Sequence, residues 1–349
     1  MSLHAISETI HRAFESAGLD PHSAGLKSVT ETIHKALVKA GLAAAAPAGE
    51  RSPAVSESAA ESAAGAKGVG AFLSLNHAGP AGARSYKLFV PSSYRGKPMP
   101  LIVMLHGCQQ HPDDFAAGTR MNELAERDGF LVAYPAQSSN ANGSNCWNWY
   151  QARDQAREGG EPEIIKGIVD EIVGNYAVDK RRVFAAGMSA GAAMAVILGT
   201  THADLFAAVG AHSGLPYGAA HDVASAFALM HGAGGKATGG PSVPIIVFHG
   251  DQDRTVVDSN ADAIVRQAVA GFEAKGRRLI ELQQVAPAGA ASRAYTSTIY
   301  TGRDGRPLVE HWALKGGTHA WSGGSSRGSF TDEKGPDASA EMVRFFMRQ

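Results

Sequence analysis

The stretch that decides the fold is RRVFAAGMSAGAAMAVIL, residues 181–198. Its first half is an apolar run typical of a buried strand, and its second half is a run of small and aliphatic residues typical of a helix. The two halves meet at Gly187-Met188-Ser189-Ala190-Gly191. A serine at a tight strand-to-helix turn has its hydroxyl exposed above the sheet, and free N–H groups at the helix start stabilise negative charge beside it. The stretch therefore predicts Ser189 as a nucleophile.

Outward from this stretch, strands alternate with amphipathic helices. Such alternation predicts an α/β architecture with a mainly parallel central sheet that is flanked by helices on both faces. We expect strands at 101–105, 130–134, 182–188, 245–248, 295–300 and 309–314, an antiparallel edge hairpin at 72–76 and 84–90, a helix after Ser189, and further helices at 113–127, 162–176, 222–230, 259–275 and 337–346.

A serine nucleophile needs a base and a group that orients the base. The strand at 245–248 runs into His249-Gly250-Asp251-Gln252-Asp253, an acidic loop at the carboxyl end of a strand, where active sites of open α/β sheets collect. Both carboxylates suit the chemistry; we favour Asp253 as the acid, with Asp251 capping the turn or helix that follows. His319, in the glycine-rich loop GGTHAW, is the predicted base, whereas His311 lies inside a strand and is predicted to be structural.

The loop after the strand at 101–105, His106-Gly107-Cys108-Gln109-Gln110, is placed to complete an oxyanion hole. A backbone N–H from Cys108, together with that of Ala190, would bind the oxygen of a tetrahedral intermediate. The second cysteine, Cys146, lies 38 positions further on. Free buried thiols are the ordinary interpretation of two cysteines in a chain without a visible secretion signal, and pairing is the alternative.

The first 68 residues differ from the rest. The segments 6–19 (ISETIHRAFESAGL) and 29–42 (VTETIHKALVKAGL) repeat at an offset of 23 residues, and each has the apolar spacing of one helical face. We expect 1–42 to form a helical hairpin appendage that packs or dimerises, with a granule-surface or lid role as the alternative. Residues 43–68, rich in Ala, Ser, Gly, Glu and Pro, read as a linker to a catalytic domain at 69–349.

Composition limits the partners. The 349 residues are 44% hydrophobic with a net charge of −1, so the chain has enough apolar residues for a large core and no basic field for nucleic acid. There is no apolar run of 18 residues and no recognisable secretory signal, which predicts no membrane span and a cytoplasmic location. Neither metal-ligand spacing nor a phosphate-binding loop is visible, so we expect no cofactor.

Five motifs together resemble a known family. HGCQQ, CWNWY, GMSAG, HGDQD followed by Thr255-Val256, and GGTHAW occur in the order seen in polyhydroxybutyrate (PHB) depolymerase-type esterases, relatives of bacterial feruloyl esterases. The resemblance covers roughly Ala71 to Gln349 and is most specific in HGC and CW. The resemblance implies an α/β-hydrolase fold. The sequence departs from the family pattern at the N-terminus, where secreted members carry a signal.

The resemblance also implies roles for individual residues. Ser189, Asp253 and His319 would form the catalytic triad, and a Cys108–Cys146 disulfide would brace the oxyanion loop. The residues implied at the substrate cleft are Trp147, Trp321 and Gln109. Because the resemblance implies a disulfide and the family has secreted members, an extracellular location is the alternative to the cytoplasmic one.

The resulting expectation is a serine carboxylesterase acting on hydroxyalkanoate oligomers or similar esters through an acyl-enzyme. A feruloyl-type esterase or a polyamide hydrolase would use the same triad. A second alternative is a polymer-granule-binding protein that acts through its N-terminal helices, and a third is a binding module with a decayed site. A homodimer formed through those helices is the expected assembly.

Overall fold

The computed structural model describes residues 70–233, 239–241, 243–289 and 292–349. The predicted N-terminal helix pair and linker lie outside the described residues. The described strands form a ten-stranded sheet in the order β1-β2-β4-β3-β5-β6-β7-β10-β9-β8, and a separate pair, β11 and β12. The strands are β1 Ala71–Gly79, β2 Gly82–Val90, β3 Met99–Leu105, β4 Leu131–Pro135, β5 Val178–Met188, β6 Ala208–His212, β7 Ile245–Gly250, β8 Ile280–Ala286, β9 Tyr295–Thr301, β10 Pro307–Leu314, β11 Trp321–Ser322 and β12 Thr331–Asp332.

The centre of the large sheet is parallel and its edges are antiparallel. Strands β4, β3, β5, β6, β7 and β10 are parallel neighbours. The β1–β2 hairpin joins β4 at one edge and β9 with β8 joins β10 at the other, all in antiparallel pairing. The predicted mainly parallel sheet and its edge hairpin are therefore confirmed.

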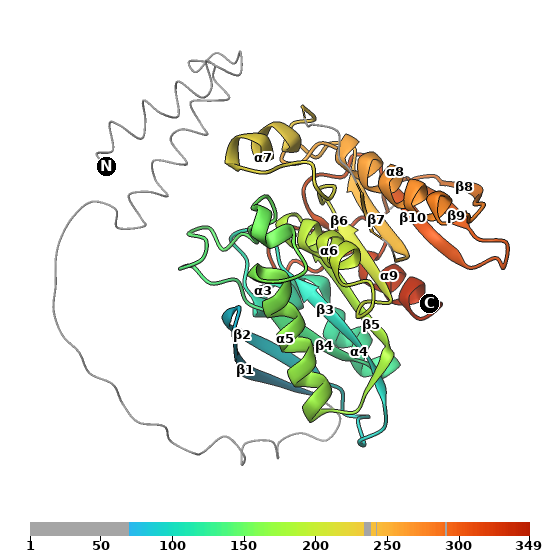
Figure 1. The fold of residues 1–349 in the computed structure, drawn as a ribbon. Helices are drawn as coiled ribbons and strands as arrows, with labels where there is room; N and C mark the ends of the chain where they lie inside the picture. Colours follow the sequence, from blue (N-terminus) through green and yellow to red (C-terminus); the bar gives the residue numbers. More distant parts are fainter. Residues whose placement is uncertain (1–69, 234–238, 242, 290–291) are drawn as a thin grey trace, which may run out of the picture. The chain divides into compact units, whose positions relative to one another are not determined.

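Helices cover both faces of the sheet (Figure 1). The helices are α3 Pro112–Thr119, α4 Met121–Asp128, α5 Gly160–Asn175, α6 Ala190–Thr201, α7 Val223–Met230, α8 Ser259–Ala274 and α9 Ala338–Phe346, with a short 3-10 helix at Ala152–Gln155. One buried cluster joins the sheet to α5, α6, α7 and α8, and a second joins its other face to α3, α4 and α9. None of the described helices is long and apolar enough to cross a membrane.

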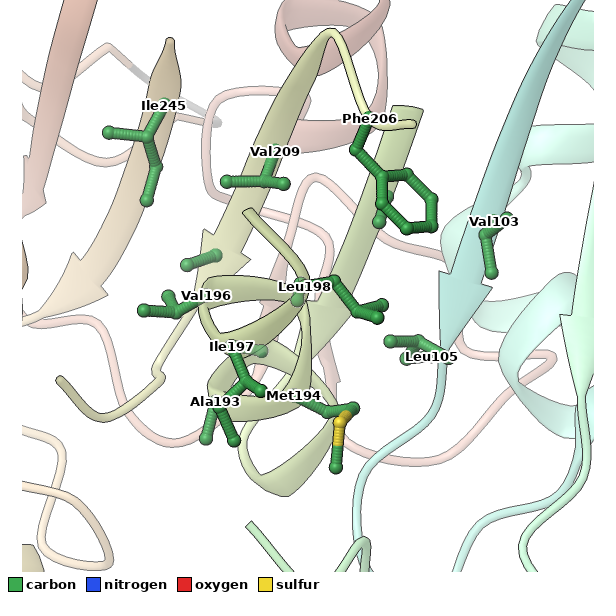
Figure 2. Close-up of a cluster of buried hydrophobic side chains, with 14 of the residues drawn as sticks. Val103, Leu105, Ala193, Met194, Val196, Ile197, Leu198, Phe206, Val209 and Ile245 are labelled. Atoms are coloured by element: carbon green, nitrogen blue, oxygen red, sulfur yellow. The ribbon is translucent and has the colours of Figure 1, made fainter. Parts of the chain in front are cut away.

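Helix α6 lies on the middle of the sheet. Figure 2 shows Met194 and Leu198 from this helix beside Val103 and Leu105 of β3, with Val209 of β6 close by. All of these side chains are fully buried, and each contributes roughly 1.5–3 kcal/mol relative to its exposed state. This packing fixes the position of the first residue of α6, which directly follows Ser189.

One expectation needs correction, and two strands were missed. The helix predicted at 113–127 is two helices, α3 and α4, separated by Arg120 at φ 56°. The break is compensated by long-range donors: Ser325 N–H donates to the Gly118 carbonyl at 2.8 Å, and Ser339 Oγ donates to the Thr119 carbonyl at 2.6 Å. Strands β6 and β8 were not predicted, because AVGAH is short and rich in small residues and because the exposed edge strand IELQQVA lacks a buried face.

Candidate active site

The predicted site residues follow different strands but leave the sheet at one edge. Strands β3, β5, β7 and β10 are parallel, so their carboxyl ends meet at the same side of the sheet. Residues 106–110 follow β3, Ser189 follows β5, 251–253 follow β7 and His319 follows β10. This edge is where ligands bind in open α/β sheets.

Ser189 has an unusual backbone conformation. Its φ is 55° and its ψ is −120°, a region that costs on the order of 1–3 kcal/mol for a residue with a side chain. The neighbouring glycines are needed for space: a Cβ on Gly191 would lie 2.1 Å from the Leu105 carbonyl oxygen, and one on Gly187 would lie 2.5 Å from the Gly191 carbonyl carbon. The start of α6 therefore packs closely against the end of β3, and this close packing requires a tight turn at Ser189.

Asp253 lies directly against His319. The Nδ1–H of His319 donates to Asp253 Oδ2 at 2.7 Å, and the N–H groups of Thr255 and Val256 donate to Oδ1 at 2.9 Å. Burial by itself would raise the pKa of the Asp253 carboxyl, but hydrogen bonds from His249, His319 and Val256 outweigh burial and hold the pKa well below its usual range. Asp253 is therefore a stable carboxylate that orients the His319 ring.

The expected cap of the turn or helix that follows Asp251 is not seen among the described residues; its carboxylate instead contacts the turn after β10. Its Oδ1 accepts the Gly316 N–H at 2.7 Å, and its Oδ2 lies 3.2 Å from the ammonium nitrogen of Lys315. These contacts hold the turn after β10 and thereby the loop that carries His319. His311 lies within β10, with its Nδ1 3.9 Å from Asp262 of α8.

The loop after β3 lies beside the serine turn. A Cβ on Gly107 would be 3.6 Å from the Cβ of Ser189, and Cys108 is joined to Cys146 in a disulfide. The exposed Gln109 has φ 65°, and its N–H donates to the Ser144 carbonyl at 2.8 Å. Within the described residues, neither the Cys108 N–H nor the Ala190 N–H donates to a protein acceptor.

Gln110 supports this loop, a function that sequence reasoning missed. Its buried amide oxygen accepts the Gly107 N–H at 3.0 Å, while its Nε2 donates to Asp114 Oδ2 at 2.9 Å and to Ser329. Ser329 itself donates to Asp114 through both N–H and Oγ. The one sequence signal for this role was the second glutamine of HGCQQ. Gln110 is buried whereas Gln109 is exposed, and the sequence does not show that difference.

The two tryptophans predicted at the cleft are in the core instead. Trp147 is 0% and Trp321 1% exposed. The indole N–H of Trp147 donates to the His106 carbonyl at 3.1 Å, and that of Trp321 donates to Ser339 Oγ at 3.0 Å. Because their rings are enclosed by the two core clusters, we correct their predicted role from substrate contact to support of the loops.

Two further buried histidines anchor the loops. His106 Nε2 accepts the Gln137 N–H at 3.1 Å. His212 accepts the Ser189 N–H on its carbonyl at 2.9 Å and the Ser322 N–H on its Nε2 at 3.0 Å. Burial lowers the pKa of His106 to about 4 and that of His212 to about 3, so both are neutral and keep these acceptor nitrogens near pH 7. His212 therefore connects the serine turn with the loop that carries His319.

Comparison with known proteins supports this assignment of the fold. A mainly parallel sheet with a serine turn after β5, an acid after β7 and a histidine after β10 defines an α/β-hydrolase. An acetyl xylan esterase from Aspergillus awamori has the same fold, with a TM-score of 0.62 and 19% identity over 80% of this chain and 100% of that one.

The family follows from the sequence match. The family model described as esterase PHB depolymerase matches residues 84–281, and the chain belongs to this family. Poly(3-hydroxyalkanoate) depolymerase C of Paucimonas lemoignei is 31% identical over 234 residues, which cover 63% of this chain and 54% of that protein. Feruloyl esterase B of Neurospora crassa is 32% identical over 148 residues, covering 42% of this chain and 49% of that one. The chain spans about half the length of these curated relatives.

Gln110→Ala would remove the acceptor for the Gly107 N–H and a donor to Asp114. We expect kcat on a p-nitrophenyl ester to fall on the order of 100-fold with little change in KM, because a shift of about 1 Å in the oxyanion loop misplaces a transition-state donor. Gln284→Ala, on the exposed edge strand β8, is the matched control and should keep wild-type kcat. A loss confined to KM would contradict this role for Gln110.

Proposed function

We propose that this protein is a serine carboxylesterase whose substrates are hydroxyalkanoate oligomers or similar small or polymeric esters. The observation that carries the proposal is the hydrogen bond from His319 Nδ1 to the buried carboxylate of Asp253, at the sheet edge where the strained turn presents Ser189. The family and the relative named as a poly(3-hydroxyalkanoate) depolymerase support the substrate class.

The reaction would follow the acyl-enzyme route. Ser189 Oγ attacks the ester carbonyl while His319 Nε2 takes the hydroxyl proton, and Asp253 stabilises the resulting imidazolium. The N–H groups of Cys108 and Ala190 donate to the oxyanion. When the carbonyl re-forms, the bond to the alcohol breaks and His319 returns the proton to the departing alkoxide oxygen. Water then attacks the acyl-enzyme in the same way, which releases the acid and restores Ser189.

A feruloyl-type esterase or a polyamide hydrolase would use the same residues. The relatives named as feruloyl and acetylxylan esterases favour ester over amide cleavage. Relative kcat/KM values on hydroxybutyrate oligomers, feruloyl esters and amide analogues would separate these alternatives. Gln109, exposed at the loop after β3, remains the predicted substrate contact.

Ser189→Ala should lower kcat on a p-nitrophenyl ester by on the order of 10⁶ without unfolding the protein, because the nucleophile is lost. Asp253→Asn should lower kcat by on the order of 10⁴, since an amide cannot hold the imidazole in the required tautomer. Asp251→Asn is the matched control and should cost far less, because Asp251 contacts the turn at Gly316. Full activity of Ser189→Ala would exclude the proposed nucleophile.

We further propose that the enzyme works in an oxidising compartment, since disulfides persist there and are rare among reduced cytosolic proteins. The Cys108–Cys146 disulfide and the family support this proposal over the cytoplasmic expectation. Alkylation of intact producing cells before lysis should leave both cysteines unlabelled. Two alkylated cysteines would show that the bond forms only after lysis, and would restore the cytoplasmic location.

The predicted role of residues 1–68 is assembly rather than chemistry. Deletion of these residues removes none of the proposed catalytic groups, so kcat/KM on a small soluble ester should stay within a few-fold of the full chain. Light scattering should show a dimer for the full chain and a monomer for the shortened one. Equal oligomeric states would refute the homodimer, and loss of attachment to polymer granules with esterase activity intact would support the granule-binding alternative.

A further inference from the structure

The Asp253 carboxylate contacts a second histidine besides His319. His249, on β7 four residues before Asp253, is 1% exposed and has its Nε2 3.4 Å from Asp253 Oδ2. The N–H groups of Thr255 and Val256 donate to Oδ1 and His319 donates to Oδ2, so the carboxylate accepts three hydrogen bonds and has His249 as a longer polar contact.

The protonation of the His249 ring follows from its neighbours. Its Nε2 lies 2.7 Å from the carbonyl oxygen of Val256, which can only accept a hydrogen bond, so Nε2 must carry the proton. That single N–H donates to the Val256 carbonyl, and Asp253 Oδ2 lies 3.4 Å from the same nitrogen. The other ring nitrogen, Nδ1, is buried and has no hydrogen-bond partner among the described residues.

We propose that His249 is a positioning residue that closes the acid loop around Asp253 and withdraws negative charge from Oδ2, so that it lowers the proton affinity of the proposed base His319. The inference rests on the proposed function only for its catalytic consequence. An N–H group close to a carboxylate oxygen reduces the negative charge that this oxygen presents to its other donor, here His319. Without the His249 N–H, Oδ2 would stabilise the His319 imidazolium more strongly, provided that Asp253 keeps its position.

Two other histidines interact electrostatically with this cluster. His212 projects from β6, and His311 lies on β10 with Asp262 of α8 beside it and Asp258 just before that helix. Burial lowers the pKa of His212 to about 3 and also lowers the pKa of His311. Burial therefore favours the neutral form of both histidines.

The sign of the effect separates tuning from simple structural support. If His249 tunes Asp253, loss of its donor should raise the pKa of His319 by about half a unit to one unit. If His249 only fills space, its loss would displace Asp253, weaken the contact with His319 and lower the His319 pKa. The acid limb of the pH profile of kcat/KM should move in the same direction as the His319 pKa.

The experiment is an NMR titration of the full chain labelled with ¹⁵N-histidine, with the His319 signals assigned through His319→Gln. The variants are His249→Leu and His249→Asn, which remove the donor, and His249→Gln, whose amide nitrogen can occupy the position of Nε2. The matched control is His202→Leu: like His249, His202 is buried and has one ring nitrogen, here Nε2, without a hydrogen-bond partner among the described residues, but it lies at the opposite end of α6 from Ser189.

We expect the upward shift of the His319 pKa in the Leu and Asn variants, and wild-type values in His249→Gln and His202→Leu. Activity on a p-nitrophenyl ester should fall roughly 10- to 100-fold in the donor-less variants and be largely rescued in His249→Gln. A downward or absent shift in the donor-less variants, or a Gln variant that behaves like them, would overturn the proposal.

A measurement on the wild type keeps the proposal testable if the donor-less variants do not fold. The ¹⁵N shifts of His249 must show a protonated Nε2 and a bare Nδ1 from pH 6 to 8, and the opposite tautomer would rule the proposal out. Neither NMR measurement requires turnover. The proposed function would fail on a different result. In that case the protein would hydrolyse no ester and a fluorophosphonate would not label Ser189.

Discussion

The contact between the first turn of α6 and the end of β3 is the constraint on which the candidate site depends. Only a residue without a side chain allows the backbone of Gly191 to approach the Leu105 carbonyl as closely as it does. This approach forces the turn at Ser189 into a strained conformation and brings the loop at Gly107 beside it. The helix start, the serine and the oxyanion loop are consequently positioned by one packing interaction, which the buried face of α6 stabilises.

Three buried histidines extend this arrangement to the other loops. His106, His212 and His249 stand at the carboxyl ends of β3, β6 and β7, and each hydrogen-bonds backbone groups of a neighbouring segment. Charged side chains in these positions would carry a large desolvation cost, whereas a neutral imidazole supplies one donor and one acceptor. The loops around the site are therefore held by polar contacts in the core, without long secondary-structure elements of their own.

The order of the elements and the position of the serine turn could be predicted because they depend on local patterns. Apolar runs, glycine spacing and amphipathic periodicity lie within a few residues of one another and need no tertiary information. The prediction was wrong where distant partners intervene. The helix expected at 113–127 is broken at Arg120, and the carbonyl groups freed there are satisfied by Ser325 and Ser339, some 200 positions away. The edge strand β8 has no buried face and hence no apolar alternation to reveal it.

The sequence by itself determined the family motifs, the serine between its glycines, and the downstream order of acid and histidine. The tertiary structure decided which side chains meet. It placed Asp253 against His319 and Asp251 against Gly316, buried Trp147 and Trp321, and separated the buried Gln110 from the exposed Gln109. Burial and hydrogen-bond partners are supplied by segments far away in the chain, so identical residue types in one short motif acquire different environments only when the sheet brings those segments together.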